Sequence, residues 1–380
     1  MLYPLSYGDI CPFSVSLEYL IIKVQGRLRN FMKLMQSAKH FSDRFLLRHL
    51  PTRLPAVLIG ALVLIGTAHS QAARQSAHAA LEQNILIADR GNNRIIEVTP
   101  DKQIVWEFDF TDRQIGHGAD DAFFAPGNKQ IVANLEQDQV IVVIDYETRK
   151  IVWQYGTGVK GSDNNELHTP DDAYMLPDGT ISVADIDNCR IAIVSQDKKL
   201  VRQYGKTHKC LSQPGYYNKP NGATPLSDGH FLITEIVGQR VTEVDANGND
   251  VYSFQAPLHY PSDAQRTVRG TIIIADYAKV GSIMELDTKG NILWQFGPFD
   301  DNSDKRLRWP SLAAELPNGN IIANDDFNHR VIVIDKETQE IVWQYGVTGR
   351  RGVLPGYLSI PDGLDWRHDN DPKPAATPVS

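Results

Sequence analysis

The chain has 380 residues, a length that suits two average domains or one large all-β unit. Hydrophobic residues make up 42%, charged residues 22%, and the formal net charge is -8. This balance is typical of a globular protein, and the absence of a basic face argues against a nucleic acid partner. The 28 glycines and 21 prolines are scattered along the chain, as expected for short strands joined by turns.

An apolar run over residues 54–68 has the surroundings of a secretory signal. Small residues follow it up to residue 72, and basic residues precede it: Lys33, Lys39, Arg44, Arg48 and Arg53. We therefore expect 32–72 to be a signal peptide, or else an N-terminal anchor. The mature protein would then be periplasmic or secreted, and it would touch a membrane only if the signal stays uncleaved.

The flanks of this segment are also assigned from the sequence. Residues 1–31 add nothing that a secretory leader needs, so Met32 or Met35 is a candidate start. We expect 73–82 to be a linker and 367–380 to be a disordered tail.

A repeat of propeller-blade length occupies the rest of the chain. The segments 150–156 and 340–346, KIVWQYG and EIVWQYG, are nearly identical. Related segments place one anchor residue in each repeat, 42 to 50 residues apart, at Trp106, Trp153, Arg202, Tyr252, Trp294 and Trp343. This period predicts an all-β fold over 83–366, a six-bladed β-propeller of four-stranded antiparallel blades.

The ends of the repeat region predict how the ring closes. The first repeat begins at its second strand, near Asn84, with no strand of the Pro-Asp-Asp-Ala type before it. A lone first strand follows the last repeat, within 358–366. We expect this C-terminal strand to complete blade one, which removes an exposed sheet edge.

Several segments resemble known propeller families. The segments 88–98, 184–194 and 324–334 resemble the NHL repeat, in which a D-x-x-N-x-R-I turn joins the second and third strands. The segments 144–155 and 334–345 are similar to PQQ-like and arylsulfotransferase-like repeats. The resemblance thus implies an NHL-repeat or PQQ-like six-bladed propeller, of the TolB-like and arylsulfotransferase-like kind. Because fold does not fix function, it leaves the activity open.

Acid and arginine recur together at the junction of the second and third strands. Arg94, Arg190, Arg240 and Arg330 begin third strands, opposite Asp89, Asp185, Glu235 and Asp325. We interpret these as ion pairs that tie neighbouring strands together, in preference to four anion sites.

One column of residues is the candidate site. Two residues before the proline of each inner strand, or at the equivalent position, stand His117, His168, Asn218, His259, Arg308 and Ser359. Carboxylates follow just inside them, at Asp120, Asp121, Asp171, Asp172, Asp263 and Asp362. We take His117, His168, His259 and Arg308 as candidate catalytic residues, and Asn218, Ser359 and the aspartates 121, 172, 263 and 362 as candidate ligand-binding residues.

The column supports two classes of function. The protein either holds a small molecule or a peptide partner at the face over its centre, or it is an enzyme. As an enzyme, it would use His117, His168 and His259 as ligands of a divalent metal in a lyase or lactonase, or a histidine with Arg308 in sulfuryl transfer. Peptidyl-hydroxyglycine lyases are NHL-like rings with three zinc-binding histidines, but their histidine follows the proline. PQQ is not expected, because the dehydrogenases that use it have eight blades.

The remaining predictions concern cysteines and assembly. Export would leave Cys189 and Cys210, in a turn and a link of the same blade, since Cys11 lies in the leader. An oxidising compartment then favours one disulfide between them. We expect the protein to be a monomer.

Overall fold

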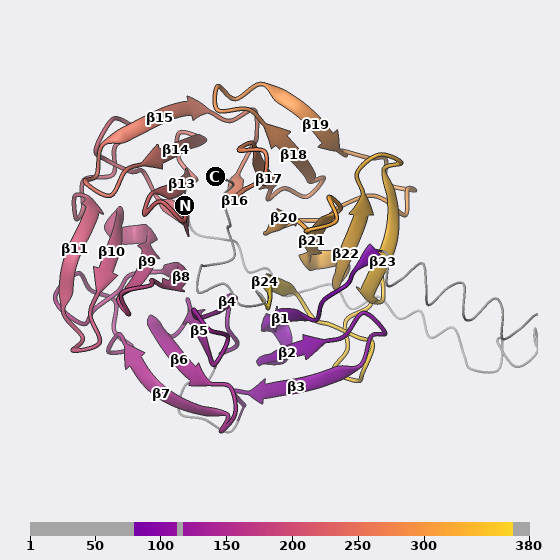
Figure 1. Ribbon diagram of the computed structural model, residues 1–380, viewed down its shortest axis with the longest axis horizontal. Coiled ribbons are helices and arrows are strands. Elements are labelled where there is room, and N and C mark those ends of the chain that lie inside the picture. The colour runs from indigo at the N-terminus through magenta and orange to yellow at the C-terminus, as the bar shows by residue number, and fades with distance from the viewer. Residues whose placement is uncertain (1–79, 112–116, 368–380) are drawn as a thin grey trace, which may run out of the picture. The chain divides into compact units, whose positions relative to one another are not determined.

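A computed structural model describes residues 80–111 and 117–367 (Figure 1). Our predictions for 1–31, for the signal or anchor at 32–72 and for the tail beyond 367 fall outside these residues, as does most of the linker at 73–82. Within the described ranges, no helix is long and apolar enough to cross a membrane.

Six four-stranded antiparallel sheets stand around a common centre, so the predicted six-bladed β-propeller is confirmed (Figure 1). The inner strands, from blade one to blade six, are β24 (Pro361–Trp366), β4 (Asp121–Phe124), β8 (Pro170–Met175), β12 (Pro220–Pro225), β16 (Pro261–Arg266) and β20 (Ala313–Glu315). The second strands are β1 (Ile85–Asp89), β5 (Gln130–Leu135), β9 (Ile181–Asp185), β13 (Phe231–Glu235), β17 (Ile272–Asp276) and β21 (Ile321–Asp325).

The outer half of each blade follows the same order. The third strands are β2 (Arg94–Val98), β6 (Val140–Asp145), β10 (Arg190–Val194), β14 (Arg240–Val244), β18 (Ser282–Leu286) and β22 (Arg330–Asp335). The outer strands are β3 (Ile104–Asp109), β7 (Lys150–Tyr155), β11 (Leu200–Gly205), β15 (Asp250–Gln255), β19 (Ile292–Phe296) and β23 (Glu340–Gly346). Short 3-10 turns join second to third strands in three blades: η1 (Arg90–Asn92), η2 (Ile186–Asn188) and η3 (Asp326–Asn328).

Ring closure occurs in blade one, as predicted. β24 pairs antiparallel with β1, with Trp366 opposite Ile85 and Leu364 opposite Ile87. Arg367, which we assigned to the tail, is held by the ring, because its Nε donates to Glu97 Oε1 at 2.9 Å.

Apolar side chains fill the space between neighbouring blades. Six hydrophobic clusters occur in the described ranges, one for each junction. At the first junction, Trp106 and Phe108 of blade one pack with Phe124 and Ile131 of blade two. Second strands are therefore buried on both faces, whereas the outer strand β3 alternates between buried and exposed residues. Radial packing of this kind supplies the core that a single twisted sheet lacks.

The ring has two faces that differ in their connections. The link face carries the turns from second to third strands and the links between blades. The opposite face carries the turns from first to second and from third to fourth strands. All residues of the predicted column precede an inner strand, so they belong to the link face.

Candidate functional site

A carboxylate brace recurs at the link face of four blades. Its acid ends the second strand, and an arginine at the start of the third strand donates to it. The Nε-to-oxygen distances are 2.8 Å for Arg94 and Asp89, 2.8 Å for Arg190 and Asp185, 2.5 Å for Arg240 and Glu235, and 2.7 Å for Arg330 and Asp325. All four acids are fully buried. The predicted strand-tying role of these pairs is confirmed, since each pair closes the register between two adjacent strands.

Acids at the end of the second strand also hold the backbone of the predicted column, which precedes the inner strands. The backbone N–H of His168 donates to Asp185 Oδ1 at 2.8 Å, and that of Arg308 donates to Asp325 Oδ1 at 2.7 Å. Asn218, His259 and Ser359 repeat this contact with Glu235, Asp276 and Asp89. In these five blades the column is therefore a backbone feature, and it leaves the side chain at each position free to differ. The N–H of His117 donates instead to Asp138 Oδ2, at 3.0 Å.

The three imidazoles of the column bind three different carboxylates. His117 Nδ1 lies 2.8 Å from Asp138, His168 Nε2 lies 3.2 Å from Asp187, and His259 Nδ1 lies 2.9 Å from Asp276. The contact with Asp276 raises the pKa of His259, whose side chain is 87% exposed.

The histidines do not form one ligand group in the described part of the chain. There, groups of three possible metal ligands within 4.8 Å of one another are Asp121, Asp172 and Asp263, and Asp228, His230 and Glu243. Arg308 lies over the ring of Trp309, 5.9 Å from its centroid, and among described residues no polar contact joins its guanidinium to these imidazoles.

The central acidic cluster, which we define as Asp121, Asp172 and Asp263, is where predicted ligand-binding residues meet. The three side chains come from blades two, three and five, and they are at most 5% exposed. In the described ranges none of them has an ion pair with lysine, arginine or histidine. Asp172 Oδ2 accepts the N–H of Ala223 at 3.0 Å, but Asp172 Oδ1 is buried without a hydrogen-bond partner.

Burial and mutual repulsion dominate the electrostatics of this cluster. Burial raises the pKa of Asp172 well above its usual range, and the neighbouring Asp171 raises it further. Burial also raises the pKa of Asp121 and Asp263, and the charge of Asp172 adds to both shifts. Three ionised carboxylates at this spacing would repel strongly, so the cluster favours protons or a cation.

Backbone irregularities place these side chains at the centre. Asp172 is the extra residue of a β-bulge between Asp171 and Ala173, and its φ is 25°, in the left-handed region. Asp121 and Asp263 occupy the equivalent position in blades two and five, and in blades one and four this position is glycine. A Cβ on Gly363 would lie 2.5 Å from Asp121 Oδ1, and one on Gly222 would lie 3.1 Å from Asp263 Oδ1. Glycine at these positions thus leaves room for the carboxylates.

A second set of acids lies nearer the link face and has a cation. Arg90 forms ion pairs with Asp120 at 2.7 Å, Asp362 at 2.8 Å and Glu136 at 3.2 Å. The guanidinium therefore compensates the outer acids, but not the central acidic cluster.

Arg90 and Glu136 were not among the predicted site residues. Each directly follows the last residue of a second strand, where the other blades have Ile186, Ile236, Tyr277 and Asp326. A comparison of this one position across repeats would have identified both, because three blades have an uncharged residue there and these two blades have opposite charges.

Cys189 and Cys210 form a disulfide, with their Cα atoms 5.2 Å apart. It joins the end of η2 to the link that leaves blade three, next to the brace of Asp185 and Arg190.

Comparison with known proteins adds fold information and a limited functional lead. No family model matches the chain. The probable peptidyl-α-hydroxyglycine α-amidating lyase pgal-1 of Caenorhabditis elegans is 23% identical over 192 residues, which cover 47% of this chain and 50% of the relative. The chain thus matches about half the length of this curated relative.

Solved structures share the ring at low identity. A Bacteroides caccae protein of unknown function is 16% identical, with a TM-score of 0.55 over 76% of this chain and 99% of that one. A streptogramin B lyase is 16% identical, with a TM-score of 0.44 over 60% of this chain and 70% of that one. The first of these likenesses supports the fold; the resemblance to NHL and PQQ-like repeats stays a prediction.

Proposed function

We propose that this protein is an exported, ligand-binding propeller that holds a divalent cation at its centre. The observation that carries the proposal is the central acidic cluster. Its carboxylate oxygens come from three blades, lie within 4.8 Å of one another, and have no cationic side chain among the described residues. The buried, unpartnered Oδ1 of Asp172 is the ligand atom that such a cation would satisfy.

The chemistry of these ligands selects the kind of cation. The set contains only oxygen atoms, which suits a hard cation such as Ca²⁺ better than a soft transition metal. Second carboxylate oxygens and water would complete its coordination. The cation would offset the repulsion among the acids and join three inner strands at the base of the link face.

The link face above the cluster is suited to binding a ligand. One hollow there is lined by Arg90, His117, Phe327 and Ile360 together with Asn93, Gln137 and two glycines, so it combines charged or titratable, neutral polar and apolar groups. Such a mixture of apolar walls and a few polar groups is usual for small-molecule sites. Export is supported by the disulfide, since such bonds persist mainly in oxidising compartments.

Calorimetric titration of the EDTA-treated full chain with CaCl₂ tests the proposal. We expect one site in the wild type and a loss of at least about tenfold in affinity for Asp172→Asn, because a buried charged ligand is removed. Asp197→Asn is the matched control, as it makes the same change at an exposed position of the same blade. No binding by the wild type at millimolar Ca²⁺, or equal affinity in Asp172→Asn, would overturn the proposal. Protonation of the carboxyl groups would then explain how the three acids tolerate burial at this spacing.

A lyase is a second candidate, favoured by the similarity to the Caenorhabditis elegans protein. The residues available for proton transfer would be His168 and His259, each paired with an aspartate at the link face. Turnover of a peptidyl-α-hydroxyglycine that disappears in His168→Ala and His259→Ala would favour it. Turnover that both variants keep, or no turnover by the wild type, would exclude this assignment.

A further inference from the structure

The junctions between blades share one polar contact on the opposite face. At five of the six junctions, the anchor residue of the outer strand donates to a carbonyl oxygen in the turn between the third and fourth strands of the next blade. The indole N–H groups of Trp106, Trp153, Trp294 and Trp343 donate to the carbonyl oxygens of Tyr146, Gln196, Lys336 and Pro100, at 2.8 to 3.0 Å. An indole ring thus fills the same space at four of the six junctions.

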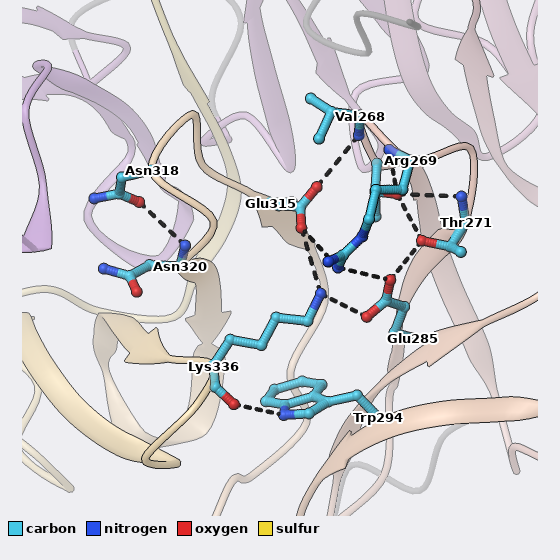
Figure 2. A network of polar contacts seen from close by, with 10 residues as sticks. Val268, Arg269, Thr271, Glu285, Trp294, Glu315, Asn318, Asn320 and Lys336 are labelled. Atoms are coloured by element: carbon cyan, nitrogen blue, oxygen red, sulfur yellow. Dashed lines mark hydrogen bonds and ion pairs between the residues drawn. The ribbon is translucent and has the colours of Figure 1, made fainter.

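Figure 2 shows the polar contacts at such a junction, between blades five and six. Trp294 donates to the carbonyl oxygen of Lys336, whose ammonium group contacts Glu285 and Glu315. Arg269 contacts the same two acids at 3.2 and 3.4 Å. The indole and this ion-pair network together occupy the junction.

The junction between blades three and four differs at each of these positions. Arg202 replaces the tryptophan, and its Nη1 donates to the carbonyl oxygen of Ala246 at 3.1 Å. Register pairing places Ile193 where Glu285 stands, and Pro225 where Glu315 stands. The indole and the charged network are thus both missing here.

A cavity of about 370 Å³ opens at this junction. Its walls are mostly apolar, formed by Leu176, Ile193, Tyr204, Leu226 and Phe231. The polar residues of the lining are Arg202, His230, Asp178, Thr180 and Ser227. Most of these apolar residues are buried, whereas Arg202 is exposed. The cavity lies on the face opposite to the predicted column and the hollow of Arg90.

The guanidinium of Arg202 indicates what the cavity takes. At two other junctions, an arginine lies over an aromatic ring of the chain: Arg367 over Tyr146, 4.3 Å from the centroid, and Arg266 over Tyr252, at 5.7 Å. A guanidinium is attracted to the negative face of an aromatic ring, more strongly when water is excluded. Arg202 has an apolar cavity beside it, where four other junctions have an indole.

We propose that this cavity is a binding site for a small molecule with a planar aromatic ring, which stacks against Arg202 and takes the place of the missing indole. The site is independent of the proposed cation, because it shares no residue with the central acidic cluster and lies on the other face. Its walls are preformed by packing within blades three and four, so binding needs no rearrangement of the ring.

Indole is the probe, added to the full-length protein and followed by ligand-observed NMR and by the imidazole signals of the protein. We expect saturable binding that shifts the His230 signals, since His230 lines the cavity, and leaves those of His259 on the link face unchanged. Arg202→Trp restores the indole of the other blades, so we expect binding at least tenfold weaker and a higher melting temperature. Arg202→Ala keeps the cavity but removes the guanidinium that would stack on the aromatic ring, so we expect binding to be a few-fold weaker.

Tyr252→Trp is the matched control, because it adds an indole at the same repeat position of the next blade, outside the cavity. We expect it to bind indole like the wild type. Equal affinity in Arg202→Trp, no binding by the wild type up to the solubility of indole, or binding that leaves His230 unshifted would each overturn the proposal. The shift of the His230 signals is measured in the wild type, so it tests the proposal even if Arg202→Trp fails to fold.

Discussion

Blade three and blade five use the same buried acid in different ways. In blade three, Asp185 accepts from Arg190, Asn188 and the N–H of His168, all within 2.8 Å. In blade five, Ser282 stands where the arginine would begin the third strand, and Asp276 binds the exposed imidazole of His259 instead. The acid and its backbone contact are therefore constant in five of the six blades, and only blade two has an apolar residue, Leu135, at this position. The cation that binds the acid varies from buried to exposed.

Removal of the buried cation of blade three should have the largest effect. Arg190→Met leaves Asp185 buried without its charge partner, so we expect a loss of about 3–5 kcal/mol in the free energy of unfolding. Urea denaturation measures it. The double variant Asp185→Leu with Arg190→Met should recover much of the loss, because no unpaired charge remains. A loss below about 1 kcal/mol in the single variant would mean that the brace is not the strand tie inferred from its geometry.

The disulfide should rank second. Cys189 and Cys210 are separated by 21 residues, and a crosslink over a loop of this size contributes about 3 kcal/mol through the unfolded state. Replacing both residues by serine should lower the stability by this amount in urea denaturation. Added reductant should destabilise the wild type and leave the double variant unchanged. If reductant does not lower the unfolding free energy of the wild type, the disulfide does not stabilise the protein.

The exposed pair of blade five should contribute least. His259→Ala removes an ion pair whose imidazole is 87% exposed, and such pairs are worth a few tenths of a kcal/mol. We expect its unfolding free energy to match that of the wild type within about 0.5 kcal/mol. A larger loss would show that the imidazole does more than cap Asp276.

The pH dependence of this pair has a defined sign. Asp276 raises the pKa of His259 in the folded state. The small contribution to stability is therefore complete below the pKa of the unfolded chain, and it is lost as pH rises through the higher folded pKa. In Asp276→Asn, the pKa of His259 measured by NMR titration should return to the ordinary histidine value of about 6.5. An unchanged pKa would mean that Asp276 is not the cause of the shift.

The repeat pattern was sufficient to predict the ring, because blade length, strand alternation and the missing first strand are all local in sequence. It also predicted the braces, since an acid and an arginine five residues apart must meet across a tight turn. The same alignment placed His117, His168 and His259 in one column, where backbone spacing fixes the position. It does not fix the direction of an imidazole, and in the structure each one turns to the acid nearest to it.

The central acidic cluster and the cavity at Arg202 depend on contacts between blades. Asp172 points to the centre because of a bulge, and Gly363 leaves space for Asp121 from the adjacent blade. Neither effect is visible in one repeat taken alone. The cavity lies beside Arg202, the single anchor that is not aromatic, and it was not predicted, because it also requires Ile193 and Pro225 from two different blades.

The pairing of β24 with β1 also fixes the order in which the ring can form during synthesis. β1 is made early, yet its inner partner is not available until the ribosome has passed residues 361–366. Until then blade one has three strands, and Asp362 is absent from the set of acids around Arg90. Blades two to six can form from contiguous sequence while synthesis continues, so the last strand made is the one that turns an open array of blades into a ring.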